Sequence, residues 1–492
     1  MKLRVSLAIS GLMLTVMPAT LAVTPKSGTA CKKLGNSSIY QGKKFTCVKS
    51  GKKLVWNKGT VLRLNKEPNP APLPSPSISP TQTPIPIPIP IPTPSPSPTF
   101  EFTDSNLFLP INTCKLKDFS RPNNSGGISN GFPNPSALSG KKIIRSLALF
   151  VDYPDLVGGY DPSKVKIDTI DDINNFYEQI SYGKLKFEWT VTDSFSRMPH
   201  EVGYYHLTRS TFQTVNPRDN LNFLEDAIRA GDPKVDYSKF DLVIIFGPKQ
   251  ATTQQIGEYP GTRSGSGIRV MSQEGQVRNI QTAVADGFRW GNTKLGYLHS
   301  AGLIHEIGHE LGLVDLYLYP NNEPHLYGSN NLYSDLGGFE GFDFMYSLGA
   351  IAPEPIAWNR WLLDFIEDRQ IACLDPNKPG IIKVESLSIR GAGTKAIVLP
   401  ISQSEAIIIE SRRSVGYDSA ITKALEGALV YRLDTKWKTG QGPFGIVKKS
   451  NLSGKSPEEV LLRPGESLLV AGIRITNLYG TDNYDVISVE RD

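Results

Sequence analysis

The chain has 492 residues, of which 39% are hydrophobic and 21% are charged, and it contains 44 glycines and 37 prolines. This length predicts two or three domains, and the sequence excludes a collagen, a coiled coil and a polytopic membrane protein, because it has no Gly-X-Y period, no heptad run and only one long apolar stretch. The formal net charge is +5, but residues 63–492 hold 42 basic and 48 acidic side chains, so the positive charge is confined to the amino-terminal region.

Residues 1–22 have the pattern of a secretory signal peptide. Lys2 and Arg4 provide a positive start, residues 5–17 form the apolar stretch, and residues 19–22 (Ala-Thr-Leu-Ala) offer small residues for cleavage. A membrane-spanning helix needs roughly 20 apolar residues, so an uncleaved anchor is the alternative that we do not favour. We expect a secreted protein, extracellular or cell-wall associated, without a transmembrane anchor in the mature chain.

Residues 23–62 are expected to form a small basic module. They contain nine lysines and no acidic residue, and glycines separate short strand-like pieces at residues 44–47 and 53–56. A unit of this size cannot bury a sufficient core without a staple. Its charge favours an anionic cell-wall polymer as a partner, with a solvated lysine-rich face as the alternative, and we expect no nucleic-acid partner.

The four cysteines predict two disulfide bonds, as is usual in exported chains. Three pairings are possible. We favour Cys31 with Cys47, inside the basic module, and Cys114 with Cys373, which bracket the central region. In the alternative for Cys114, its thiolate occupies a metal in a latent precursor.

Residues 63–98 form a proline-rich linker. Fourteen prolines fall between residues 68 and 98, which favours an extended polyproline II spacer. The following segment, residues 99–140, is expected to be either a strap held by Cys114 or a propeptide-like segment.

Residues 141–373 alternate between strand and helix patterns, and the expected fold class is α+β. After residue 373, short alternating runs between glycine and polar turns predict a separate C-terminal β domain, residues 374–492, with a sandwich-like architecture. The central region is predicted to have strands at residues 143–153, 184–191 and 241–246, an edge strand at 268–271, and helices at 171–180 and 219–230. The C-terminal strands are expected at residues 396–400, 406–409, 428–433, 467–475 and 484–489.

The candidate chemistry lies in residues 305–315 (His-Glu-Ile-Gly-His-Glu-Leu-Gly-Leu-Val-Asp), on a helix predicted from about residue 297 to 311. His305 and His309 are four residues apart, so both imidazoles reach one cation. Glu306 lies beside the first ligand, where it can act as a general base without binding the metal. Gly312 is expected to take a positive φ and end the helix, so that the chain returns with Asp315 as the third ligand.

Two histidines and one carboxylate leave an open position on Zn²⁺, which is the pattern of a catalytic rather than a structural site. The chain has six histidines, and the four others lack this spacing: His200, His206, His299 and His325. His299 is a distant candidate for the site because it precedes His305 on the same predicted helix. Ca²⁺ is a further cofactor candidate in the acidic and Asn-rich loops of residues 321–335, although no clean ligand pattern occurs there.

A glycine-rich turn at residues 337–347 contains Met345 and Tyr346. Here the sequence resembles the metzincin clan, whose Met-turn packs a methionine beneath the zinc, and the predicted helix at residues 354–365 corresponds to the clan's next helix. From about residue 143 onward, the resemblance narrows to the immune inhibitor A family of secreted bacterial metallopeptidases. It is carried by residues 149–154 (Leu-Phe-Val-Asp-Tyr-Pro), residues 181–185 (Ser-Tyr-Gly-Lys-Leu) and the zinc motif.

The resemblance implies a metzincin-like zinc protease domain with a mixed sheet and an active-site helix. In such an endopeptidase, His305, His309 and Asp315 bind zinc, Glu306 is the general base, and Tyr346 is a candidate for stabilising the oxyanion. The resemblance also implies that a protein or peptide substrate pairs as an extended strand with an edge strand of the central sheet.

Two alternatives stay open. In a gluzincin-type protease the third ligand is a downstream glutamate, for which Glu340 and Glu354 are available. In a protein of another class, a wall-associated binding or adhesive protein, the zinc is structural and the β domain contacts a ligand. Glu306 disfavours this second alternative, because a structural site needs no general base.

Overall fold

The computed structural model describes most of the chain after residue 97 and parts of the module before it. The chain forms two compact units, Met1–Ser95 and Pro96–Asp492, and each is described by itself. The predicted signal peptide, nearly all of the linker and the candidate calcium loops lie outside the described residues. The described residues are 28–31, 34, 37–40, 43–51, 53–58, 60–61, 98–121, 127–164, 169–206, 217–248, 270–277, 279–283, 301–318, 342–346, 354–419, 421–449 and 460–492.

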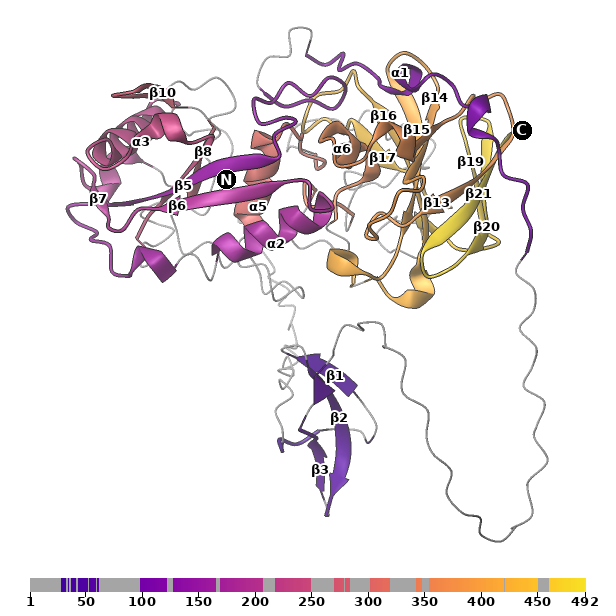
Figure 1. Cartoon of the computed structure of the whole chain (residues 1–492), viewed down its shortest axis with the longest axis horizontal. Helices are drawn as coiled ribbons and strands as arrows, with labels where there is room; N and C mark the ends of the chain where they lie inside the picture. Colours follow the sequence, from indigo (N-terminus) through magenta and orange to yellow (C-terminus); the bar gives the residue numbers. More distant parts are fainter. Residues whose placement is uncertain are drawn as a thin grey trace, which may run out of the picture. The chain divides into compact units, whose positions relative to one another are not determined.

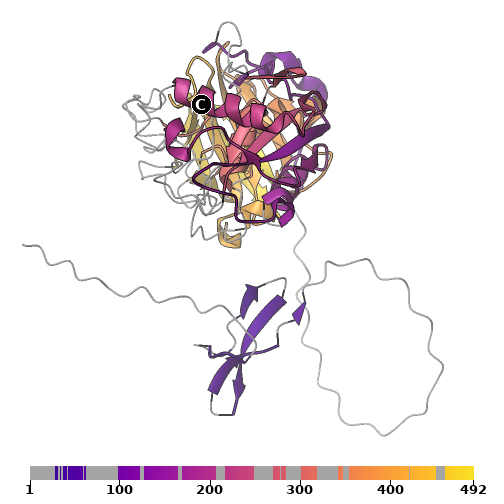
Figure 2. The same ribbon diagram turned by 90° about the vertical axis from the view of Figure 1, so that its left-hand side faces the viewer.

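The first unit contains a small four-stranded antiparallel sheet centred on one strand, β2 (Figure 2). Phe45 and Cys47 of this strand are buried, and Cys47 forms a disulfide bond with Cys31, as the sequence predicts. The strands are β1 (Ser37–Tyr40), β2 (Lys43–Ser50), β3 (Lys53–Trp56) and β4 (Thr60–Val61), and β2 pairs with each of the other three.

A five-stranded sheet forms the first layer of the second unit, and all its described pairings are parallel (Figure 1). The sequence predicts a mixed sheet here, so this detail differs from the prediction. Parallel neighbours need long crossovers, and at least 30 residues separate most consecutive strands. The order is β11-β8-β5-β6, with β7 beside the end of β5, and the strands are β5 (Ile143–Asp152), β6 (Lys186–Val191), β7 (Ser196–Arg197), β8 (Leu242–Phe246) and β11 (Ile280–Ala283).

The strand predicted at the sheet edge, residues 268–271, is wrong in its placement. Strand β9 (Val270–Ser272) instead pairs with β10 (Gly275–Val277) in a separate antiparallel hairpin. Gly275 has a φ of 128°, a backbone conformation that favours glycine, and it begins the returning strand directly after the turn.

Helices cover both faces of the parallel sheet. On β5, Ile144, Ala148 and Phe150 belong to the core that contains helices α2 (Asp171–Ile180) and α5 (Ala301–Glu310). The alternate residues of β5, which are Leu147, Leu149 and Val151, pack in the core of α3 (Pro217–Gly231) on the opposite face. A strand buried on both faces is apolar at consecutive positions, which explains the continuous hydrophobic run that predicts β5.

The C-terminal region contains two sheets that share a core. The larger one has the order β12-β14-β15-β16-β17, with β18 also beside β16, and the smaller one has the order β13-β21-β20-β19. Their strands are β12 (Ile371–Cys373), β13 (Gly380–Glu385), β14 (Ala396–Pro400), β15 (Glu405–Arg412), β16 (Gly427–Asp434), β17 (Phe444–Ile446), β18 (Leu461–Leu462), β19 (Ser467–Val470), β20 (Ile473–Gly480) and β21 (Tyr484–Arg491).

The larger C-terminal sheet is buried on both faces. Ile407 and Ile409 of β15 pack towards the smaller sheet, whereas Ala406 and Ile408 join the core that contains α5. That same core includes the two tryptophans of α6 (Ala357–Leu362), a helix shorter than the predicted span of residues 354–365. The structure is therefore α+β with few helices and several sheets, and one core crosses the domain boundary predicted at residue 373.

The segment before the first parallel strand is built into this unit. It contains a short helix, α1 (Ile111–Cys114), and Cys114 forms the predicted disulfide bond with Cys373. The backbone N–H of Leu109 donates to the carbonyl of Cys373, and that of Phe119 donates to the carbonyl of Thr435. Within the described residues, no helix is both long enough and apolar enough to cross a membrane.

Candidate metal centre

Helix α5 carries the two histidines and ends as the sequence predicts. Gly312 has a φ of 106°, its N–H donates to the carbonyl of His309, and the next N–H, that of Leu313, donates to the carbonyl of Gly308. This pair of hydrogen bonds is a Schellman motif, in which a residue of positive φ reverses the chain after the last helical turn. A side chain at position 312 is also excluded by space, because a Cβ there would lie 2.1 Å from Oδ1 of Asn134.

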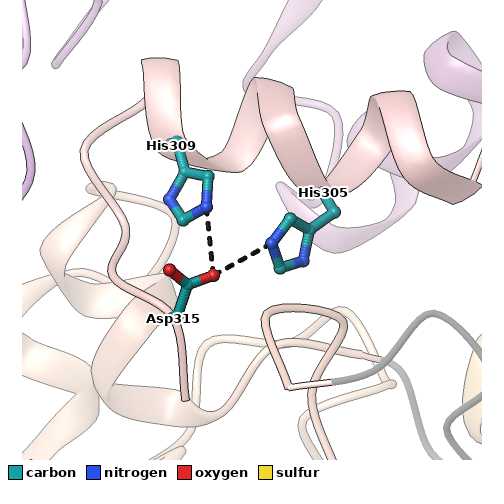
Figure 3. Close-up of side chains that lie close together, drawn as sticks. All are labelled: His305, His309 and Asp315. Atoms are coloured by element: carbon teal, nitrogen blue, oxygen red, sulfur yellow. Dashed lines mark hydrogen bonds and ion pairs between the residues drawn. The ribbon is translucent and has the colours of Figure 1, made fainter. Parts of the chain in front are cut away.

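The reversal places Asp315 against both imidazoles (Figure 3). Its Oδ1 lies 3.1 Å from Nε2 of His305 and 3.2 Å from Nε2 of His309. One ligand atom from each residue lies within 4.8 Å of the other two, and all three side chains are buried. The predicted ligands are therefore brought together in the fold.

The outer nitrogens of both imidazoles are fixed by backbone carbonyls. Nδ1 of His305 donates to the carbonyl of Phe344 at 3.0 Å, and Nδ1 of His309 donates to the carbonyl of Leu313 at 2.8 Å. Because a carbonyl only accepts, each Nδ1 carries the proton, and the Nε2 atoms face the carboxylate. Such outer hydrogen bonds are the usual support of metal-binding histidines.

Two further observations fit a cation at this point. Nε2 of His309 is buried, and its contact with Asp315 lacks the alignment of a hydrogen bond, so within the described part of the chain this atom has no hydrogen-bond partner. Two imidazole nitrogens and a carboxylate oxygen are also a donor set that transition metals accept. The cluster of His305, His309 and Asp315 can therefore hold a metal ion.

The electrostatics of the cluster favour positive charge between its members. Burial lowers the pKa of His305, but the hydrogen bond and charge of Asp315, with the charge of Glu306, outweigh it and raise this pKa to about 9. Burial raises the pKa of Asp315, but the two imidazoles outweigh it and hold this pKa well below its usual range. A bound cation would occupy the position that these shifts favour for a proton.

The predicted Met-turn lies against α5. Met345 is fully buried, and its carbonyl accepts a hydrogen bond from Leu316, one residue after the third candidate ligand. A Cβ at position 308 would lie 2.5 Å from Sδ of Met345 and 2.9 Å from the ring of Phe344, so the helix and the turn meet at this glycine. Gly308 is therefore required by close packing between α5 and the turn.

Asp343 holds the turn in place. Its Oδ1 accepts from the N–H of Met345 at 2.7 Å, and its Oδ2 accepts from the N–H of Ile356 at 2.9 Å and from Nδ2 of Asn359 at 3.0 Å. These bonds support a strained backbone, because Asp343 has a φ of 130°. Tyr346 follows, half-buried, with its N–H donating to the carbonyl of Asp343, and its proposed role in catalysis stays a prediction.

Glu306 is half-buried and lies on α5 directly after the first candidate ligand. Of the rival third ligands, Glu354 is fully buried elsewhere, where Arg360, Gln179 and the N–H of Tyr417 bind its carboxylate. Glu340, His299 and His325 lie outside the described residues. The alternative of a free Cys114 thiolate is wrong, because this residue forms a disulfide bond.

Three residues that support the site were missed by reasoning from the sequence. Oγ1 of Thr439 donates to Oδ2 of Asp315 at 3.2 Å and accepts from the N–H of the same residue at 3.0 Å. Asn134 and Ser136, from the segment before the parallel sheet, donate to the carbonyls of Leu311 and Glu310 at the end of α5. No local pattern marks these residues, because their partners lie more than 100 positions away in the sequence.

Comparisons with known proteins give no further assignment, since neither a protein-family model nor a curated protein matches this chain.

Proposed function

We propose that this protein is a secreted, zinc-dependent endopeptidase of the metzincin type, similar to the immune inhibitor A family. The observation that carries the proposal is the buried group of His305, His309 and Asp315, with both imidazoles oriented by backbone carbonyls. Three protein ligands leave one coordination position open, whereas a structural zinc site fills all four with protein. Zinc is the preferred metal because two imidazoles and one carboxylate form one of its common catalytic ligand sets.

In the proposed reaction, the three ligands hold the ion at the end of α5. Zinc, when bound, supplies Lewis acidity, which lowers the pKa of water towards about 7 and polarises a carbonyl oxygen. Glu306 accepts the proton of the attacking water and returns it to the leaving amine. Its place beside His305, on a half-exposed side of the helix, supports this role because substrate and water can reach it.

The remaining chain supplies a route for substrate. Within the described residues, β11 is the strand at the edge of the parallel sheet and the one that packs on α5. Nε2 of Gln281, on this strand, donates to the carboxylate of Glu310 at 2.5 Å and so ties the edge to the helix. We propose that an extended peptide adds to this edge, which would bring its backbone alongside the metal centre.

The proposal extends to the location of the protein. The signal-like pattern of residues 1–22 supports export, and the two disulfide bonds are the kind that persist in an oxidising compartment. The lysines of residues 23–62 support retention on an anionic cell-wall polymer.

Casein cleavage tests the function directly. The zinc-loaded protein should cut casein, and Glu306→Gln should lose at least 100-fold in rate at equal zinc content, because general acid–base catalysis contributes about 10²–10⁴-fold. Glu178→Gln is the matched control, since Glu178 is an exposed glutamate of α2 away from the cluster. Equal activity of the parent and Glu306→Gln would refute the catalytic role, and an inactive parent with bound zinc would favour the binding protein.

A further inference from the structure

The third candidate ligand is held by a residue from the C-terminal β region. The hydroxyl of Thr439 accepts a hydrogen bond from the backbone N–H of Asp315 at 3.0 Å and donates one to its Oδ2 at 3.2 Å. A hydroxyl has a single proton, so accepting from the N–H leaves that proton free to point at the carboxylate. The two bonds therefore fix both the backbone and the side chain of Asp315.

Thr439 is itself held in an ordered loop between β16 and β17. Asp434 donates its N–H to the carbonyl of Pro443 and closes the loop, and Lys438 and Gln441 exchange two hydrogen bonds across it. Two glycines of positive φ, Gly440 and Gly442, complete the turn. The loop thus offers the hydroxyl from a fixed position.

The segment before the parallel sheet fastens this loop to the rest of the unit. Nδ2 of Asn130 donates to the carbonyl of Trp437 at 2.6 Å, and the N–H of Phe119 donates to the carbonyl of Thr435 at 3.1 Å. The same segment reaches α5, because the N–H of Ser129 donates to the carbonyl of Gly312. The loop and the end of the metal-site helix are therefore held by one strap.

We propose that Thr439 is a positioning residue of the metal centre, so that the C-terminal β region forms part of the site instead of an independent module. The inference rests on the metal site of the proposed function. With Oδ2 occupied by the hydroxyl, Oδ1 is the oxygen turned towards both Nε2 atoms, at 3.1 and 3.2 Å. Losing the hydroxyl frees the carboxylate to rotate and leaves the N–H of Asp315 without this partner.

Zinc affinity of the full-length protein, measured by competition with a chromophoric chelator, tests the proposal without any assay of proteolysis. Outer-shell partners of metal ligands typically contribute 10–100-fold to affinity, so Thr439→Val and Thr439→Ala should weaken zinc binding by about that factor. Thr439→Ser keeps the hydroxyl and should stay within about threefold of the parent. Thr422→Val is the matched control, because Thr422 is exposed in the same region and its side chain makes no capping bond.

The outcomes separate this inference from the proposed function. Unchanged affinity in both the Val and Ala variants would overturn it, as would an equal loss in Thr439→Ser. Thermal unfolding of the metal-free variants checks the fold, and a general loss of structure in the Val and Ala variants with normal affinity in Ser would still support the hydroxyl's role. Zinc binding by the parent without casein cleavage would refute the peptidase and leave Thr439 in place, whereas no zinc binding by the parent would refute both.

Discussion

Replacing Gly308 by alanine should disturb the metal centre through the Met-turn, although the exchange is favourable for a helix in isolation. The new Cβ would lie 2.5 Å from Sδ of Met345 and 2.9 to 3.0 Å from the ring of Phe344. Non-bonded carbon atoms prefer about 3.5 to 4.0 Å, so the sulfur would have to move by roughly 1 Å. Both neighbours are buried, so they cannot yield into solvent.

Two energies oppose each other in this variant. Alanine is about 1 kcal/mol better than glycine inside a helix, whereas overpacking a core typically costs about 1–3 kcal/mol. We therefore expect a net loss of about 0–2 kcal/mol in the free energy of unfolding. The effect on the site should be larger, because the carbonyl of Phe344 holds Nδ1 of His305 at 3.0 Å and a shift of 1 Å would break that hydrogen bond.

The assay is zinc affinity beside chemical denaturation, for Gly308→Ala, Met345→Ala and the double variant. Loss of an outer hydrogen bond should weaken zinc binding about 10–100-fold in the single glycine variant. Removing the Met345 side chain relieves the closest contact, so the double variant should show a smaller effect of the alanine than the parent background does. Additive effects, or a glycine variant with unchanged zinc affinity and higher stability, would refute the packing explanation.

Three other perturbations have expected outcomes. Cys373→Ser should lower the free energy of unfolding by about 2–5 kcal/mol under oxidising conditions, because its disulfide closes a span of 259 residues; no difference from the reduced parent would be expected. Arg145 and Lys141 outweigh burial and lower the pKa of Asp241 to about 2, so Asp241→Asn should cost about 1–2 kcal/mol at pH 7. This difference should be complete above pH 4 and vanish as the pH falls towards 2 in denaturation curves. A chain that starts at Pro96 should keep its melting temperature, whereas one that starts at residue 141 should not fold, because it lacks several buried side chains.

Features that depend on neighbouring residues could be predicted from the sequence. Helix α2 begins with two aspartates and places its apolar residues at helical spacing, and its predicted and observed bounds coincide at Asp171–Ile180. The spacing of His305 and His309 and the glycine at position 312 likewise specify one helix face and its end. The continuous apolar run of β8 (Leu242–Phe246) indicates a strand covered on both faces, as it is.

Some local predictions failed because the deciding feature was weak in the sequence. Residues 467–475 were expected as one strand, but the structure contains the hairpin β19–β20 with a turn at Ala471 and Gly472, whose φ angles are 52° and 72°. Alanine rarely takes a positive φ, so the pair lacks the Asn-Gly signal of such turns. The single core across residue 373 was also hidden, because an apolar strand does not reveal what covers each of its faces.

Only the tertiary structure decided how the candidate site is supported. Thr439 meets Asp315 across 124 positions of sequence, Asn134 reaches the end of α5 across 177, and Met345 packs on Gly308 from a separate turn. Each of these contacts joins segments whose order along the chain says nothing of their distance in space. The sequence by itself determined which residues can bind a metal, because that depends on chemistry and helical spacing. Their orientation depends on long-range packing and hydrogen bonds, which arise only when the sheets and the strap assemble around α5.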